Sequence, residues 1–223
     1  MDILEIELQT CHLEETEDFY SKQLGLEIIK REKTSVSFQA GLSVLTFIKS
    51  IEINPKYHFA FNIPQNKLDE AIIWISNKAT LIKNNDNSLV TNFTNWNAKA
   101  IYFYDNNGNI IEFIARFDLA NISAKVFDSY SIQSISEVGV VTDNPLIFAE
   151  TLLSEYQLVY FTKGPKTGDF VALGDDNGLI IISSPTRSWY PTKSLAEKHY
   201  FKMKILSDHS ERLIVVNEKN ASS

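Results

Sequence analysis

The sequence predicts a mixed α+β protein built from a repeated βαβββ unit, with three copies and a shortened fourth. Three observations predict this fold. Segments in which apolar and polar residues alternate dominate the chain, and such alternation is typical of strands. A few helical segments interrupt them. The same order of strand, helix and three strands recurs along the 223 residues, which indicates an internal repeat.

The first unit begins with a strand in which Leu4, Ile6 and Leu8 alternate with polar residues. A helix is expected next, because Glu14 and Glu15 suit the positive end of a helix dipole. Gly25 ends this helix. Three strands follow at about 26–31, 35–39 and 43–49, with a hairpin turn at Ala40-Gly41.

The pattern then restarts twice. The second unit is expected to have a strand at 58–63, a helix at about 66–77 and strands at 99–104 and 109–116. The third begins near Ile132, has a helix that starts at Pro145 after an Asp-Asn cap, and has strands at about 158–162, 169–173 and 179–183. The fourth has strands at 199–205 and 212–216, and the segment between them is too short for a helix.

Composition excludes several classes of protein. The formal net charge is −7 with dispersed lysines, so a basic surface for nucleic acid is not expected. Cys11 is the sole cysteine, which excludes an intramolecular disulfide and a cysteine-based zinc cage. The first residues lack a signal peptide pattern, and no apolar stretch is long enough to cross a bilayer. We therefore expect a soluble cytoplasmic protein with neither nucleic acid nor membrane as partner.

Several of these segments resemble the vicinal-oxygen-chelate superfamily of glyoxalases, bleomycin-resistance proteins and extradiol dioxygenases. The resemblance rests on the opening strand 3–8, the Phe19-Tyr20 pair, the Leu24-Gly25-Leu26 step, the segment 57–61 and the hairpin 101–113. It covers residues 3–116 well, 132–184 less well and 197–217 in outline. It implies units paired into curved mixed sheets. We expect one module at 1–119, with a candidate metal site, and a second, degenerate one at 130–217.

In that family a divalent metal lies inside the cupped sheet, bound by residues of the first and last strands of paired units. Carried over by position, the resemblance implies Glu5, His58 and Glu112 as ligands. Thr46 stands where glyoxalase I members carry a fourth ligand, normally glutamate. The present chain thus departs from the family pattern at Glu5, which replaces a histidine, and at Thr46.

The residues themselves leave alternatives open. Glu112 lies between apolar neighbours on both strand faces, so it must be paired, protonated or bound to metal, or else lie at a hydrated edge; Arg116 is one candidate partner. A lone strand histidine such as His58 is more often hydrogen-bonded than metal-bound. Glu5 also fits a solvated strand face. Glu137 and His199 occupy the corresponding places in the third and fourth units, which predicts a second half that forms a pocket or serves the structure.

Other pocket candidates come from aromatic and cationic residues. Tyr102 and Tyr104 share one strand face and could line the first cup, although core packing explains them equally. Arg187 belongs to a loop, 186–191, that is rich in rings. Such a loop could cover a pocket and bind an anionic or aromatic ligand, or simply pack on its own rings.

Three functions compete. The first is a metal-dependent lyase, isomerase, transferase or dioxygenase that acts on a small oxygen-rich substrate. Two carboxylates and one imidazole suit Mn, Fe, Co, Ni or Zn, and the ion would act as a Lewis acid. The second is a metal-free small-molecule binding protein of the bleomycin-resistance kind. The third is a structural module that has lost its site. Pockets could form within one chain or between the two chains of a homodimer.

Overall fold

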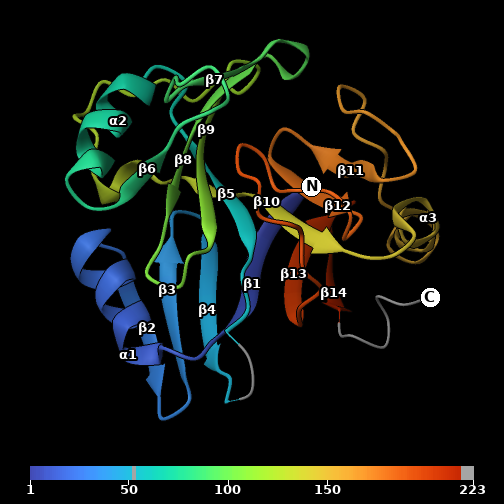
Figure 1. Cartoon of the computed structure of the whole chain (residues 1–223), viewed down its shortest axis with the longest axis horizontal. Coiled ribbons are helices and arrows are strands. Elements are labelled where there is room, and N and C mark those ends of the chain that lie inside the picture. Colours follow the sequence, from blue (N-terminus) through green and yellow to red (C-terminus); the bar gives the residue numbers. More distant parts are fainter. Residues whose placement is uncertain (52–53, 217–223) are drawn as a thin grey trace.

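The computed structural model describes residues 1–51 and 54–216 (Figure 1). Within these residues, fourteen strands form one continuous, curved, mixed sheet, so the predicted α+β class is confirmed. The main path of hydrogen-bonded strands runs β2-β3-β4-β1-β10-β5-β9-β8-β6. No helix in the described part of the chain is long and apolar enough to span a membrane.

The first two units follow the predicted order of elements. Unit 1 contains β1 (Asp2–Thr10), α1 (Leu13–Glu17), the π-helical turn η1 (Asp18–Gln23), β2 (Glu27–Glu32), β3 (Ser35–Ala40) and β4 (Ser43–Lys49). Unit 2 contains β5 (His58–Ile63), α2 (Leu68–Ser76), β6 (Thr80–Ile82), β7 (Thr91–Phe93), the 3₁₀ turn η2 (Thr94–Trp96), β8 (Ala98–Tyr104) and β9 (Ile110–Arg116). The short strands β6 and β7 were not expected from the sequence.

The last two units depart further from the repeat. After the capped turn η3 (Ser129–Ser131), unit 3 contains β10 (Ser134–Val141), α3 (Pro145–Tyr156), β11 (Phe170–Asp175) and β12 (Gly178–Ser183). The strand expected at 158–162 is reduced to one bridge, between Tyr160 and Leu173. Unit 4 consists of β13 (Phe201–Ser207) and β14 (Ser210–Val216), joined directly by a tight turn without a helix.

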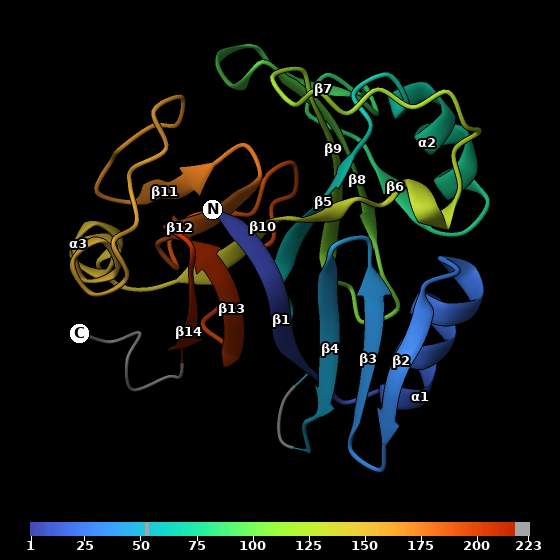
Figure 2. The ribbon, with the colours of Figure 1, turned by 180° about the vertical axis from the view of Figure 1, so that it is seen from behind.

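The units pair across the chain rather than only with their sequence neighbours. β1 of unit 1 runs antiparallel to β13 of unit 4, and β5 of unit 2 runs antiparallel to β10 of unit 3. We call these pairs the 1–4 half and the 2–3 half. Backbone hydrogen bonds therefore join strands that lie on opposite sides of the expected boundary between 119 and 130. The division into two modules remains a prediction. Figure 2 shows β1 beside β13 from behind.

Two apolar clusters lie on the two faces of the sheet. The larger packs α1, α2 and α3 against the outer, convex face, where the helices lie at the edges of the view (Figure 1). The smaller lies inside the 2–3 half and includes several alanines, among them Ala60, Ala98 and Ala100. Small residues on this concave face leave space, and that space positions the candidate site.

Candidate functional site

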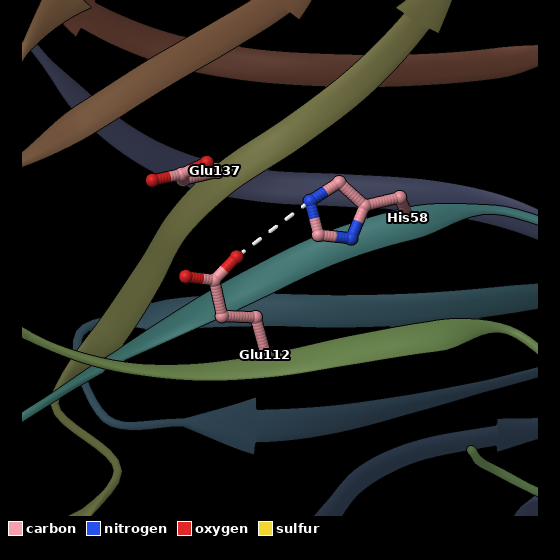
Figure 3. A group of neighbouring side chains, drawn as sticks. All are labelled: His58, Glu112 and Glu137. Atoms are coloured by element: carbon pink, nitrogen blue, oxygen red, sulfur yellow. Dashed lines mark ion pairs between the residues drawn. The ribbon is translucent and has the colours of Figure 1, made fainter. Parts of the chain in front are cut away.

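Three strands bring two carboxylates and one imidazole to the same place inside the 2–3 half. In the register, Ala60 of β5 is paired with Glu112 of β9 on one side and with Glu137 of β10 on the other. His58 lies two residues before Ala60, so the pleat places it on the same face. One ligand atom from each of His58, Glu112 and Glu137 lies within 4.8 Å of the others, and all three residues are buried (Figure 3). The set could hold a metal ion.

The His58 ring is oriented as a ligand would need to be. Its Nδ1 donates to the carbonyl oxygen of Ile110 at 3.0 Å, because a carbonyl can only accept. Burial lowers the pKa of His58 to about 4, so the ring is neutral near pH 7. The lone pair then resides on Nε2, which lies 3.7 Å from Oε2 of Glu112. A second ring nitrogen fixed by a hydrogen bond is the usual arrangement of a metal-binding histidine.

Glu112 carries a polar atom that the protein does not satisfy. Its Oε1 is buried and has no hydrogen-bond partner among the described residues. Burial, and next the charge of Glu137, raise the pKa of Glu112 well above its usual range, whereas Arg116 and a hydrogen bond from the Tyr102 hydroxyl oppose the rise. Leaving a buried carboxylate oxygen unpaired is costly, and an exchangeable proton or a cation at this position would remove that cost.

Glu137 is held by a buried guanidinium. Arg116 is fully buried and forms an ion pair with Glu137 through Oε1. Its remaining donors reach Ser136 at 3.2 Å and Asp176 at 3.4 Å. Burial raises the pKa of Glu137 above its usual range, although the charge of Arg116 and its hydrogen bond oppose the rise. Because a guanidinium stays charged in proteins, the direct pair favours negative charge on Glu137 over negative charge on Glu112. Arg116, considered from the sequence as a partner of Glu112, thus bonds to Glu137.

The three residues form the floor of a cavity of about 310 Å³. Aromatic rings make most of its walls: Phe93, Trp96, Tyr102, Phe170, Trp189 and Tyr190. The loop between β12 and β13 supplies Trp189, whose ring centroid lies 5.2 Å from that of His58. This close approach requires a glycine at 139, because a Cβ there would lie 2.6 Å from the Trp189 ring.

The sequence-derived site residues divide between the two halves. His58 and Glu112 come together, and the candidates Glu137, Tyr102 and Arg187 line the same cavity. Glu5 is not in this group: it is paired in register with Lys204 and Val44 in the 1–4 half.

The other candidates also lie apart from the carboxylates. Thr46 contacts Glu5 at 3.4 Å through its hydroxyl. His199 pairs with Glu197 at 3.0 Å and does not line the cavity that contains Glu112 and Glu137. Tyr104 packs at the edge of the inner apolar cluster.

The sequence interpretation gave Glu137 a pocket role and no metal. The repeat did contain the signal, since Glu137 takes in unit 3 the place that Glu5 takes in unit 1. It did not reveal which units pair. The cavity rings Phe93, Trp96 and Phe170 carried no signal, because isolated aromatic residues in loops and short strands have no periodicity.

No protein-family model matches the sequence, and comparison with curated proteins finds no match. Among solved structures, the chain is similar to a "putative dioxygenase" from Bacillus subtilis subsp. subtilis str. 168, with 16% identity and a TM-score of 0.60 over 96% of this chain and 84% of that one. A lactoylglutathione lyase from Agrobacterium tumefaciens (20% identity, TM-score 0.42) covers 50% of this chain with 90% of its own. A glyoxalase/bleomycin resistance protein/dioxygenase from Nocardioides (18% identity, TM-score 0.44) covers 56% with 89% of its own. With the repeat and the curved sheet, the first of these likenesses shows that the chain has the vicinal-oxygen-chelate fold that its sequence predicts.

Proposed function

We propose that the protein is a divalent-metal-dependent enzyme that acts on a small oxygen-rich substrate, with His58, Glu112 and Glu137 as the metal ligands. One observation carries the proposal. Oε1 of Glu112 is a buried acceptor without a partner among the described residues, and it belongs to a carboxylate grouped with a neutral imidazole and a second carboxylate. Buried charged groups are normally paired or bound to a metal.

The donor set fits a first-row divalent ion. Imidazole and carboxylate ligands suit Mn, Fe, Co, Ni or Zn, and three protein ligands leave coordination positions for a substrate. When bound, the ion would polarise adjacent substrate oxygens as a Lewis acid.

The chain's own residues would prepare the site. The Ile110 carbonyl orients the His58 ring, and Arg116 fixes one oxygen of Glu137. Burial, followed by the charges of Glu112 and Glu137, raises the pKa of Tyr102 well above its usual range, so its hydroxyl keeps its proton and donates to Glu112. The aromatic walls surround these polar groups with apolar surface, and polar interactions beside such surface are stronger than in bulk solvent.

A second candidate function is metal-free binding of a small molecule. The ion pair between Arg116 and Glu137 favours it, because the guanidinium already neutralises one carboxylate and a proton can neutralise Glu112. Such a site would tolerate an uncharged ligand without any metal.

Elemental analysis of protein purified without a histidine tag separates the two functions. The metal-dependent function predicts about one divalent ion per chain, retained through gel filtration and lost after treatment with a chelator. A protein that contains no metal, and that takes up none when dialysed against Mn²⁺, Zn²⁺, Ni²⁺ or Co²⁺, would leave the binding protein as the better account.

A further inference from the structure

We propose that this cavity selects a ring-bearing anion, with the flat ring between the aromatic walls and the anionic group near Arg187. The inference deepens the proposed function and rests on it, because the substrate oxygens beside the ring would face the metal ligands at the cavity floor. The inference specifies which small oxygen-rich molecules would bind in the cavity. Three independent features support it.

The first feature is the aromatic wall. Tyr190 lies edge-on to Tyr102 at 5.8 Å and to Phe93 at 6.1 Å between ring centroids, and its hydroxyl is 3.2 Å from that of Thr91. Phe93 in turn stacks on Trp96 at 5.7 Å. The rings therefore hold one another in place. Fixed π faces favour a flat ring over a flexible aliphatic chain, and about 310 Å³ lies at the small end of the range of ligand pockets.

The second feature is the charge at the floor. With a divalent ion bound, Glu112 and Glu137 would cancel its charge, and the buried guanidinium of Arg116, which also contacts Asp176 at 3.4 Å, would lie directly beside the group. Burial makes the guanidinium charge count for more than it would in water. The floor would then attract a carboxylate, a phenolate or an enolate.

The third feature is Arg187, which lines the same cavity from the loop between β12 and β13. Its guanidinium packs over the Phe170 ring at 4.7 Å, and Nη1 donates to Asp169 at 3.1 Å. The side chain is 41% exposed. A guanidinium has five N–H donors in a planar fork, so an anion in the cavity can be bound while the contact with Asp169 is kept.

Aromatic walls can also hold organic cations, and the same rings permit that alternative. The guanidinium groups of Arg116 beside the floor and of Arg187 at the wall both oppose it. A cationic ring is therefore a direct test of the sign of the charge.

Calorimetric titration of the Mn²⁺-loaded protein tests the proposal with four probes. The anion 2-hydroxybenzoate is expected to bind roughly fivefold tighter than the uncharged 2-hydroxybenzyl alcohol, the size of a half-exposed ion pair. It should bind about tenfold tighter than lactate, which lacks the apolar ring surface. Benzyltrimethylammonium should bind more weakly than either ring-bearing alcohol or anion. Equal affinities for 2-hydroxybenzoate and 2-hydroxybenzyl alcohol would overturn the inference. So would equal affinities for 2-hydroxybenzoate and lactate, or tighter binding of benzyltrimethylammonium than of 2-hydroxybenzoate.

Two arginine variants locate the effect. Arg187→Gln should remove the roughly fivefold preference for 2-hydroxybenzoate and leave the affinity for the alcohol unchanged. Arg31→Gln is the matched control, because Arg31 is also a partly exposed arginine paired with a carboxylate, on β2 of the 1–4 half. An Arg187→Gln protein that keeps the preference contradicts the inference. A parent protein that takes up no Mn²⁺ contradicts the proposed function instead, so the two failures are told apart.

Discussion

The two halves of the sheet place the same kind of residue in opposite environments. Glu137 on β10 of the 2–3 half is buried and paired with the fully buried Arg116. Glu5, its counterpart on β1 of the 1–4 half, is half-buried and contacts a threonine hydroxyl. Enclosure, and not the glutamate alone, makes one of the two positions a candidate site, because removal from water strengthens charge interactions and disfavours unpaired charge.

The cause of this difference lies in the connections. Unit 3 is followed by a loop at 184–200 that brings Trp189 over the concave face. Within residues 201–216 of unit 4 no comparable segment is present, since β13 and β14 are joined by a turn at Asp208 and His209, both with positive φ. In the 1–4 half Leu213 and Val215 of β14 therefore remain exposed, at 55% and 39%.

The comparison predicts the largest effect for Arg116. Arg116→Met should lower the free energy of unfolding by about 3–5 kcal/mol, because it leaves Glu137 buried without its partner. Lys202→Met is the matched control in the 1–4 half, where Lys202 pairs with Glu7 at 2.7 Å but is 31% exposed. That change should cost about 1 kcal/mol or less. Denaturant unfolding curves measure both, and equal losses would show that the halves do not differ in enclosure.

The next largest effect is the loss of folding stability at acidic pH. The pKa of His58 is lowered to about 4 in the folded protein, against about 6.5 in the unfolded chain. Below pH 6.5 the unfolded chain binds a proton that the folded protein refuses, so His58 should remove about 3 kcal/mol of stability between pH 6.5 and 4. Glu112, whose pKa is raised by burial, acts in the opposite direction, since its contribution is lost as the pH rises.

Unfolding curves of the parent and of His58→Gln at several pH values isolate the histidine. The variant should lose less stability than the parent on acidification from pH 6.5 to 4. His209→Gln, in the exposed turn of the 1–4 half, is the control and should follow the parent. Parallel curves for the parent and His58→Gln would mean that the His58 ring is hydrated.

A smaller effect is expected for the wall of the cavity. Gly139→Ala would force the added Cβ against the Trp189 ring and should cost about 1–3 kcal/mol by overpacking. The Trp189 ring would shift away from His58, and the tryptophan emission should move to longer wavelength. Gly168→Ala is the control, since nothing lies within 4 Å of a Cβ built there. An unchanged spectrum in Gly139→Ala would indicate that the wall is already loose.

The sequence predicted most of the fold because strand alternation and turn residues are local signals. The strand His58–Ile63 and the hairpin turn at Asp105–Gly108 have their predicted places. The prediction of a strand at 158–162 was largely wrong, because Gly164 and Pro165 follow this segment closely and it forms only one bridge to β11.

The site was harder to predict because it depends on which units pair. His58 and Glu112 lie in one unit, on strands that are parallel neighbours, and the resemblance to the family, not the residues alone, grouped them. The third member was sought in Glu5, whereas β10 supplies Glu137. Pairing between units far apart in sequence leaves no local mark, and neither does the ion pair to Arg116.

Thermal melting with Mn²⁺, Zn²⁺, Ni²⁺ and Co²⁺ tests most directly the claim that the 2–3 half holds a metal. An ion at a hundredfold excess over its dissociation constant should stabilise the parent by about 2.7 kcal/mol, a shift of about 5–11 °C for a chain of this size. Glu112→Gln and Glu137→Gln should each abolish the shift at nearly constant side-chain size, and Glu5→Gln should retain it. A parent that no metal stabilises, or a shift lost in Glu5→Gln and kept in Glu137→Gln, would contradict the account.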